Sequence, residues 1–384
     1  MRLILHAIGE QSNNLLHDII KTACRIKHDI LIYLLQEPAN VRTISINRPD
    51  DWHVHLRDND ALNHTVPATA QHFARALVMP NLKPALTTLT SVTAYRQRII
   101  KAMAHHSHFV PYMTLYLNES VTPDDLNAIA DDPFILGAKL YPAGATTNSD
   151  EGAQSIRALY PLLEIMQDNN LVLQIHGEIT HGDIFERESQ FIETCLASLV
   201  RDFPKLRIVL EHISTRVAVE FVTQAPDTVA ATITPHHLLY NRNQLLAGGI
   251  RPHYYCLPIL KHEQDQIALQ QAAISGNSKF FAGTDSAPHA KDQKESACGC
   301  AGVYSAPFAL AMYAQVFDNL NELSKLNAFM GHFGATFYQL PILDERIELI
   351  KEPQTIPQTL TFGHDYVVPL AAGSTLQWSI RESN

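Results

Sequence analysis

The hydrophobic positions that follow Val41 fall into short β-like runs separated by segments with helical periodicity. The runs that predict strands are Thr43–Asn47, Ala76–Met79, Phe109–Leu117, Phe134–Leu140, Leu171–Ile175, Leu206–Leu210, Val229–Ile233 and Lys279–Ala282. Helical patterns lie between them, for example at Ser155–Asp168, Gln190–Asp202 and Glu263–Ile274. Strands that alternate with helices pair in parallel through helical crossovers. Eight such strands predict an α/β fold of the (β/α)8 TIM-barrel type, which typically takes about 250 residues.

The two ends of the chain depart from this alternation. Within residues 1–40, apolar side chains recur at helical spacing from Leu15 to Leu34, and Pro38 ends the run. This pattern predicts an N-terminal helical extension that packs on the barrel or on a partner subunit; the alternative is an appendage with no part in the chemistry. Residues 41–384 are interpreted as one barrel domain, in which a helical piece and short β-like runs after Asn319 form a C-terminal cap.

Composition narrows the class of protein. Hydrophobic residues make up 46% and charged residues 18% of the 384 positions, which excludes a disordered chain and a coiled coil. The formal charge of −10 argues against nucleic acid as a partner, since a nucleic-acid-binding face is basic. We expect no membrane association, because the apolar run Ile30–Leu35 is far shorter than the roughly 20 residues of a spanning helix. An odd number of cysteines, five, and no secretory pattern at the start indicate a cytoplasmic location.

Twenty histidines in an acidic chain point to metal chemistry or proton transfer. Two of them, His53 and His55, follow the first predicted strand, where residues i and i+2 project to the same side and can reach one metal. Further polar residues mark the ends of other predicted strands: Lys139, His176, His212 and Asp285. A single strand-end histidine is more often a satisfied structural residue, and a buried lysine can pair with a carboxylate. Together, however, at the C-terminal rim of one barrel, the six residues predict a metal site.

This set of residues resembles the metal centre of the amidohydrolase superfamily. The resemblance implies that His53 and His55 bind the buried metal and that His176 and His212 bind the exposed one. It also implies that Lys139, carboxylated on its side-chain nitrogen, bridges the two metals. A carbamate is an anion that two cations neutralise, which removes the difficulty of a buried ammonium. The ligand set favours two Zn²⁺ per subunit, although Co²⁺ or Mn²⁺ could use the same ligands.

Longer motifs around these residues resemble the dihydroorotase family, specifically its shorter, homodimeric bacterial type. The motifs are Pro49–Asp58, Val78–Asn81, Ala138–Ala143 and Gly283–His289. The resemblance implies the reversible cyclisation of N-carbamoyl-L-aspartate to L-dihydroorotate and water, a step of pyrimidine biosynthesis. It implies that a hydroxide bridges the metals and attacks the ring carbonyl, while Asp285 ligates the first metal and carries the proton. It further implies a homodimer that takes a small-molecule substrate.

The same resemblance assigns the substrate contacts. Arg57 offers a planar fork of donors suited to a substrate carboxylate. The residues that the resemblance places against the substrate are Arg57, Asn81, His176, Leu257, His289 and Ala301, the main chains of Leu257 and Ala301 lying at the ring edge. Thr146 and Thr147 match the family's threonine pair on a loop that closes over the substrate. Outside this context, Arg57 could pair with Asp58, Asn81 could cap a helix, and the loop could be an ordinary connection.

Two other functions remain open from the sequence. A hydantoinase shares the metal framework but should not need the side chains that would hold an acidic substrate. A dihydroorotase-like chain that only scaffolds a transcarbamoylase typically lacks metal ligands, whereas all six are present here.

Two further groups of residues give weaker evidence for a function. Cys298 and Cys300 lack the second cysteine pair of a zinc knuckle, and His236 with His237 could support the site from beside it.

Overall fold

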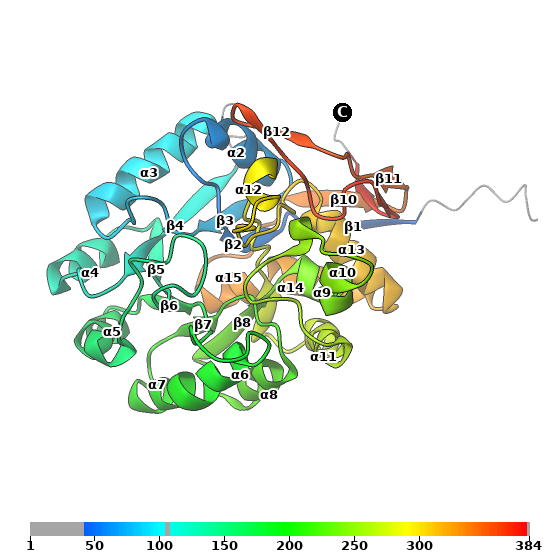
Figure 1. Ribbon diagram of the computed structural model, residues 1–384. Coiled ribbons are helices and arrows are strands. Elements are labelled where there is room, and N and C mark those ends of the chain that lie inside the picture. The colour runs from blue at the N-terminus through cyan, green and yellow to red at the C-terminus, as the bar shows by residue number, and fades with distance from the viewer. Residues whose placement is uncertain (1–41, 104–107, 382–384) are drawn as a thin grey trace, which may run out of the picture. The chain divides into compact units, whose positions relative to one another are not determined.

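The computed structural model describes residues 42–103 and 108–381, and the predicted extension over residues 1–40 lies outside them. Its central sheet has eight parallel strands, each paired with the next one along the chain. The strands are β2 (Asp50–Val54), β3 (Arg75–Val78), β4 (Val110–Leu117), β5 (Ile135–Leu140), β6 (Val172–Ile175), β7 (Ile208–Leu210), β8 (Val229–Ile233) and β9 (Phe280–Ala282). A parallel bridge between Val54 and Ser286 joins the first strand to the segment after the last. The strands thus form a nearly closed barrel, which confirms the fold predicted from the sequence (Figure 1).

The prediction of Thr43–Asn47 as the first barrel strand is wrong. This segment is β1 (Thr43–Asn47), which lies outside the barrel in a three-stranded sheet with β10 (Arg346–Ile350) and β15 (Ser379–Ile380). The first barrel strand is β2, so His53 lies within a strand and not behind one.

Two adjacent acidic residues make β2 difficult to predict as a strand from the sequence, because aspartate is rare in buried strands. Asp50 accepts hydrogen bonds from Nε and Nη2 of Arg75 at 2.7 and 2.5 Å. Asp51 accepts from N and Oγ1 of Thr284 at 2.8 and 2.6 Å. Both carboxylates therefore have partners far away in the sequence. Asp51 in addition ties the start of the barrel to the segment that carries Asp285.

Helices surround the barrel (Figure 1). They are α2 (Leu62–Ala70), α3 (Leu89–Ala102), α4 (Pro123–Ala130), α5 (Tyr160–Asp168), α6 (Arg187–Phe191), α7 (Ala197–Asp202), α8 (Arg216–Gln224) and α11 (Glu263–Ile274). The predicted helix Glu263–Ile274 has the bounds of α11. The predicted start of the helical segment Gln190–Asp202 is too late in the sequence, because α6 begins at Arg187. The helix then continues through a π-helical turn (Ile192–Leu196) into α7. Capping boxes at Thr88 and Thr122 begin α3 and α4.

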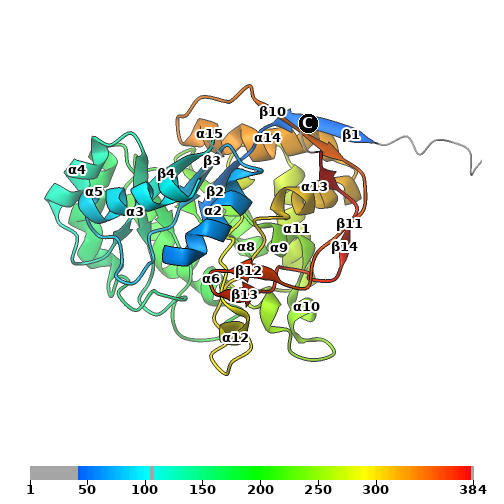
Figure 2. The same ribbon diagram turned by 90° about the horizontal axis from the view of Figure 1, so that it is seen from above.

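The two ends of the barrel are covered differently. Figure 2 shows α14 (Leu326–Gly331) and α15 (Phe333–Phe337) at one end, and α12 (Lys291–Lys294), which follows the last barrel strand, at the other. Near α15, the rings of Trp52 and Tyr338 stack with centroids 4.5 Å apart. Only glycine fits at Gly334, because an added Cβ would lie 2.0 Å from Nε1 of Trp52. Packing therefore seals one end, and the other end carries the connections that follow the strands.

The C-terminal segment combines helices with short strands. After α13 (Ala309–Asn319) come α14, α15 and then β10 to β15, as the helical piece and the β-like runs of this segment indicate. The remaining short strands are β11 (Gln354–Thr355), β12 (Leu360–Phe362), β13 (Asp365–Val367) and β14 (Thr375–Leu376). Within the described residues, no helix has the length and apolar character needed to cross a membrane.

Candidate active site

A pocket lies at the carboxyl ends of the barrel strands. Its lining residues are His55, Arg57, Asn81, Tyr141, Thr146, Thr147, His176, His212, Leu257, Asp285, Ala287, Ala301 and Gly302. A closed parallel barrel brings the ends of its strands to one rim, so residues far apart in the sequence meet there. Three residues predicted for the site are not in this lining: His53, Lys139 and His289. Each of them lies beside a residue that lines the pocket: His53 beside His55, His289 beside Arg57 and Lys139 beside Tyr141.

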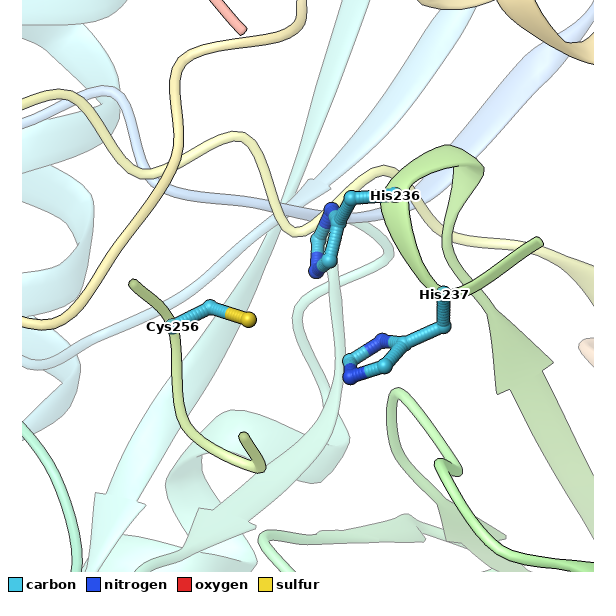
Figure 3. A group of neighbouring side chains, drawn as sticks. All are labelled: His236, His237 and Cys256. Carbon is cyan, nitrogen blue, oxygen red and sulfur yellow. The ribbon is translucent and has the colours of Figure 1, made fainter. Parts of the chain in front are cut away.

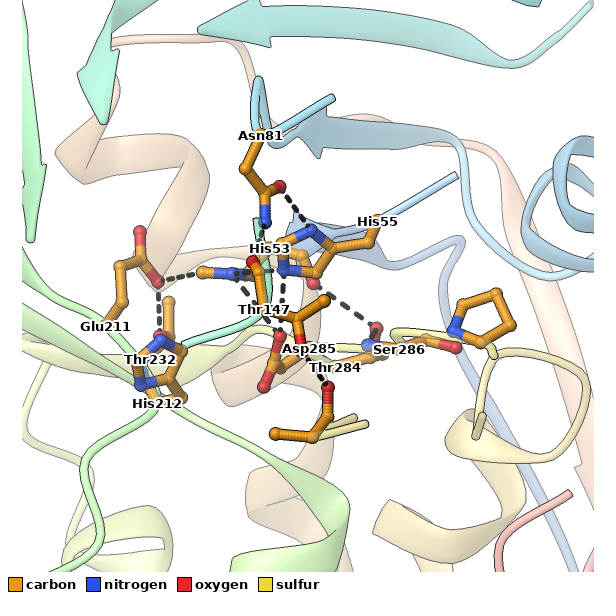
Figure 4. Close-up of polar contacts among 12 residues, drawn as sticks. His53, His55, Asn81, Thr147, Glu211, His212, Thr232, Thr284, Asp285 and Ser286 are labelled. Carbon is orange, nitrogen blue, oxygen red and sulfur yellow. Dashed lines mark hydrogen bonds and ion pairs between the residues drawn. The ribbon is translucent and has the colours of Figure 1, made fainter. Parts of the chain in front are cut away.

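Three buried side chains converge closely at the end of β2 and after β9. The Nε2 atoms of His53 and His55 lie 3.4 Å apart, and Oδ1 of Asp285 lies 3.5 and 3.1 Å from them (Figure 4). Ligand atoms at this spacing can hold one metal ion. Burial lowers the pKa of both histidines, which favours the neutral imidazole that binds metals. Burial opposes ionisation of Asp285, but the polar contact with His55 and the proximity of His53 and Lys139 hold its pKa below the ordinary value.

Two acceptors fix the orientation of these histidines. Oε2 of Glu211 lies 2.8 Å from Nδ1 of His53, and Oδ1 of Asn81 lies 2.8 Å from Nδ1 of His55 (Figure 4). Because both partners accept, each imidazole carries its proton on Nδ1 and presents the lone pair of Nε2. Glu211 is buried and also accepts from Oγ1 of Thr232 at 2.5 Å. Glu211 is absent from the residues predicted from the sequence, although its place at the end of a buried strand was an available signal.

Lys139 is buried without a hydrogen-bond partner among the described residues. Its side chain is 0% exposed, and Nζ makes no hydrogen bond in the part of the chain that the structure describes. Nζ lies 5.1 Å from the centroid of the Tyr141 ring. Burial lowers the pKa of the amine to about 8. Because an unpaired buried ammonium is costly, this position favours the neutral amine over the cation.

The second histidine pair lies beside the first. The ring centroids of His176 and His212 are 4.8 Å apart, and the ring of His53 lies 5.0 Å from that of His212. Nδ1 of His212 is buried and has no partner among the described residues, whereas Nε2 of His176 contacts Oε2 of Glu178 at 2.8 Å. His212 and Asp285 both adopt left-handed backbone conformations, with φ of 42° and 45°. Strain of this kind is typical of functional sites, and the unpartnered Nδ1 of His212 fits a ligand of a second metal.

Arg57 reaches the pocket from the segment after β2. Its Nε donates to the carbonyl of Pro288 at 2.8 Å, and Nη2 lies 3.0 Å from Nε2 of His289. Burial and the charge of Arg57 lower the pKa of His289 to about 2, so this imidazole is neutral. The alternative pairing of Arg57 with Asp58 is wrong, because Asp58 accepts from Nε and Nη2 of Arg98, both at 2.8 Å. The guanidinium of Arg57 is therefore not neutralised by its neighbour in the sequence.

The loop with the threonine pair connects two walls of the pocket. Oγ1 of Thr147 donates to the carbonyl of Ala301 at 3.2 Å, and the carbonyl of Thr147 accepts from Nδ2 of Asn81 at 3.2 Å. Nδ2 of Asn148 donates to the carbonyl of Asn81, also at 3.2 Å. Thr146 and Thr147 both line the pocket. The loop is thus in contact with the site and is not an ordinary surface connection.

A second group of potential metal ligands lies outside this lining: His236, His237 and Cys256 (Figure 3). Both ring nitrogens of His237 have partners, Oγ1 of Thr234 at 2.8 Å and the carbonyl of Pro258 at 3.0 Å. Sγ of Cys256 donates to the same carbonyl at 3.3 Å. Hydrogen bonds therefore account for the burial of two of the three side chains. The hypothesis that His236 and His237 support the site stays a prediction.

Comparison with known proteins gives the class of this protein. The model of the amidohydrolase family matches residues 50–341, so the chain belongs to that family. It is 53% identical over 344 residues to a dihydroorotase of Nitrosococcus oceani, covering 89% of this chain and 100% of the relative. The crystal structure of dihydroorotase from Campylobacter jejuni has 36% identity and a TM-score of 0.83, with 89% and 98% of the two chains covered. Dihydroorotase from Saccharomyces cerevisiae in complex with 5-fluoroorotic acid has 36% identity and a TM-score of 0.81, with 89% and 99% covered. Within the amidohydrolases, the chain belongs to the dihydroorotases.

Proposed function

We propose that this protein catalyses the reversible cyclisation of N-carbamoyl-L-aspartate to L-dihydroorotate and water in pyrimidine biosynthesis, with two Zn²⁺ per chain. One observation carries the proposal: a single pocket combines a set of potential metal ligands with the guanidinium of Arg57. Hydrolysis of a cyclic amide uses the metal ligands, and recognition of an acidic substrate uses the guanidinium. The 5-fluoroorotic acid bound to the Saccharomyces cerevisiae relative supports a carboxylated pyrimidine as the substrate class.

The resemblance to the amidohydrolases supports an assignment of ligands to the two ions. Those that would hold the Zn²⁺ ions are His53, His55 and Asp285 for one, His176 and His212 for the other, and the carbamate of Lys139 for both. When bound, the ions polarise an amide carbonyl and acidify a water molecule. The carbamate forms when the neutral Nζ of Lys139 adds to CO2 and releases one proton. The absence of a hydrogen-bond partner for Nζ among the described residues supports this modification.

Asp285 is the proposed proton carrier. In the hydrolytic direction, its carboxylate takes the proton of the attacking water and delivers it to the amide nitrogen that leaves. In the cyclising direction, it takes the proton of the carbamoyl nitrogen and delivers it to the oxygen that leaves. The lowered pKa of Asp285 supports base action first, because the carboxylate is ionised at neutral pH.

Substrate turnover distinguishes this function from its rivals. The zinc-loaded protein should hydrolyse L-dihydroorotate with a kcat/KM at least about 100-fold above those for hydantoin and dihydrouracil, because a site built for a polar group rejects analogues that lack it. Neither rival ring carries the carboxylate that Arg57 would bind. Preference for hydantoin or dihydrouracil would instead identify a hydantoinase, and failure to turn over any of the three would favour a scaffold.

Arg57→Met should raise the KM for L-dihydroorotate by about 10- to 150-fold. The variant loses a charge-assisted hydrogen bond to the substrate carboxylate, which contributes roughly 1.5–3 kcal/mol. Steady-state kinetics measures the change. Arg98→Met is the matched control, because Arg98 pairs with Asp58 and is not part of the pocket lining. An unchanged KM in Arg57→Met would show that another group anchors the carboxylate.

A further inference from the structure

Lys294 is a buried cation bound to three main-chain carbonyls. It ends the short helix α12 and is 3% exposed. Its Nζ donates to the carbonyl oxygens of Tyr255, Cys300 and Gly302, each at 2.8 Å. These bonds use all three donors of the ammonium group. Because burial of an ammonium group is costly, its three bonds to two separate segments point to a role in holding those segments together.

The three carbonyls belong to the two segments that form one wall of the pocket. Tyr255 lies two residues before Leu257, and Cys300 and Gly302 enclose Ala301. Leu257, Ala301 and Gly302 line the pocket. The segments are also joined directly, since N of Gly302 donates to the carbonyl of Tyr255 at 3.0 Å. Lys294 therefore binds both segments of this wall, and it does not itself line the pocket.

The position of Ala301 is fixed from several sides. Its carbonyl accepts from Oγ1 of Thr147 at 3.2 Å and lies 3.1 Å from Nε2 of His289. Its N–H has no acceptor among the residues that the structure describes. The carbonyl of Cys300 and the N–H of Ala301 belong to one peptide group. A cation on that carbonyl polarises the group and strengthens the N–H as a donor.

The backbone next to Ala301 has little room to move. Gly302 has a φ of 144°, and an added Cβ would lie 2.5 Å from the carbonyl oxygen of Ala287. The segment therefore passes directly against the turn that carries His289. A change at Lys294 that shifts Gly302 must also shift Ala301.

We propose that Lys294 is a positioning residue for substrate binding, which holds the main-chain atoms of Leu257 and Ala301 at the spacing that the pyrimidine ring edge requires. The inference rests on the proposed function and on the family resemblance, which places these main-chain atoms at the ring edge of the substrate. Lys294 itself need not touch the substrate, because its three donors are already used.

The test compares Lys294→Met with the wild-type protein and with Lys291→Met. Lys291 lies on the same helix but pairs with Glu295 at the surface, so its variant controls for the loss of a lysine charge. We expect Lys294→Met to raise the KM for L-dihydroorotate about ten-fold or more, since misplacement of binding groups by about 1 Å has effects of up to ~100-fold. We expect kcat to stay within about three-fold and the zinc content to stay unchanged, because the metal ligands lie on other segments. The dissociation constant of 5-fluoroorotate should rise in parallel with KM.

The outcomes separate this inference from the proposed function. Wild-type protein that neither turns over L-dihydroorotate nor binds 5-fluoroorotate overturns both. Active wild-type protein together with an unchanged KM in folded Lys294→Met overturns the positioning role alone. A purely structural role would lower the active fraction, and hence the apparent kcat, but leave KM unchanged. If Lys294→Met does not fold, Lys294→Gln, which retains two donors, should still raise KM by about three-fold, and an unchanged KM there would contradict the inference.

Discussion

Lys139→Ala is expected to abolish nearly all turnover of L-dihydroorotate and to lower the zinc content, while the protein stays folded. The variant lacks the nitrogen that would carry the carbamate. Two cations would then share one anionic ligand fewer, and their repulsion is strong in a buried site of low dielectric constant. The fold should survive because Nζ of Lys139 makes no hydrogen bond within the described residues that its removal could break. Elemental analysis of zinc, thermal unfolding and initial rates measure the three effects.

Lys261→Ala is the matched control for this experiment. Lys261 is also buried, at 4% exposure, but its Nζ donates to the carbonyl of Ile259 at 3.1 Å, and it does not line the pocket. Its variant should retain both zinc and turnover. Full zinc content and wild-type rates in Lys139→Ala would show that Lys139 is not a bridging metal ligand.

Asp285→Asn is expected to lower turnover in both directions by roughly 10² or more, which is the usual contribution of general acid–base catalysis. Asparagine has nearly the same shape but cannot take up and release the proton at neutral pH. It also tolerates the left-handed conformation of this position, where φ is 45°. The main-chain bond from N of residue 285 to the carbonyl of His53, at 2.8 Å, does not depend on the side chain. The variant should therefore fold and retain at least part of its metal.

Asp58→Asn provides the comparison for the loss of a carboxylate. Asp58 pairs with Arg98 outside the pocket lining, so its variant should keep the wild-type rate. Rates measured from L-dihydroorotate and from N-carbamoyl-L-aspartate must fall together in Asp285→Asn. A near-wild-type rate in either direction would exclude Asp285 as the proton carrier.

The barrel and its polar rim could be predicted because both leave local signals in the sequence. The run Val229–Ile233 has the same bounds as β8, and the pattern at Glu263–Ile274 has those of α11. Strand-end residues such as His176 and His212 are conspicuous because a buried, mostly apolar run ends at most two residues before each of them. Once parallel strands close into a barrel, their ends must lie at one rim. The meeting of these residues around one pocket then follows from topology alone.

The first barrel strand and the support of the histidines could not be predicted in this way. β2 starts with Asp50, whose burial depends on Arg75 in the neighbouring strand. Glu211 accepts a hydrogen bond from Nδ1 of His53, which lies 158 positions away in the sequence. Such pairs have no spacing that a periodic pattern could reveal. Their identification requires the register of the barrel, which only the folded structure provides.

A crystal structure of the zinc-loaded protein with 5-fluoroorotate would show both the metal centre and the contacts of the bound ring. Anomalous scattering at the zinc edge locates the metals, and electron density at Nζ of Lys139 reports the carbamate. We expect two zinc ions joined by a carboxylated Lys139, with the ligand's carboxylate on Arg57 and its ring edge against the main chain of Ala301. An unmodified Lys139 beside a single zinc ion in active protein, or a ligand that does not contact Arg57, would contradict this expectation.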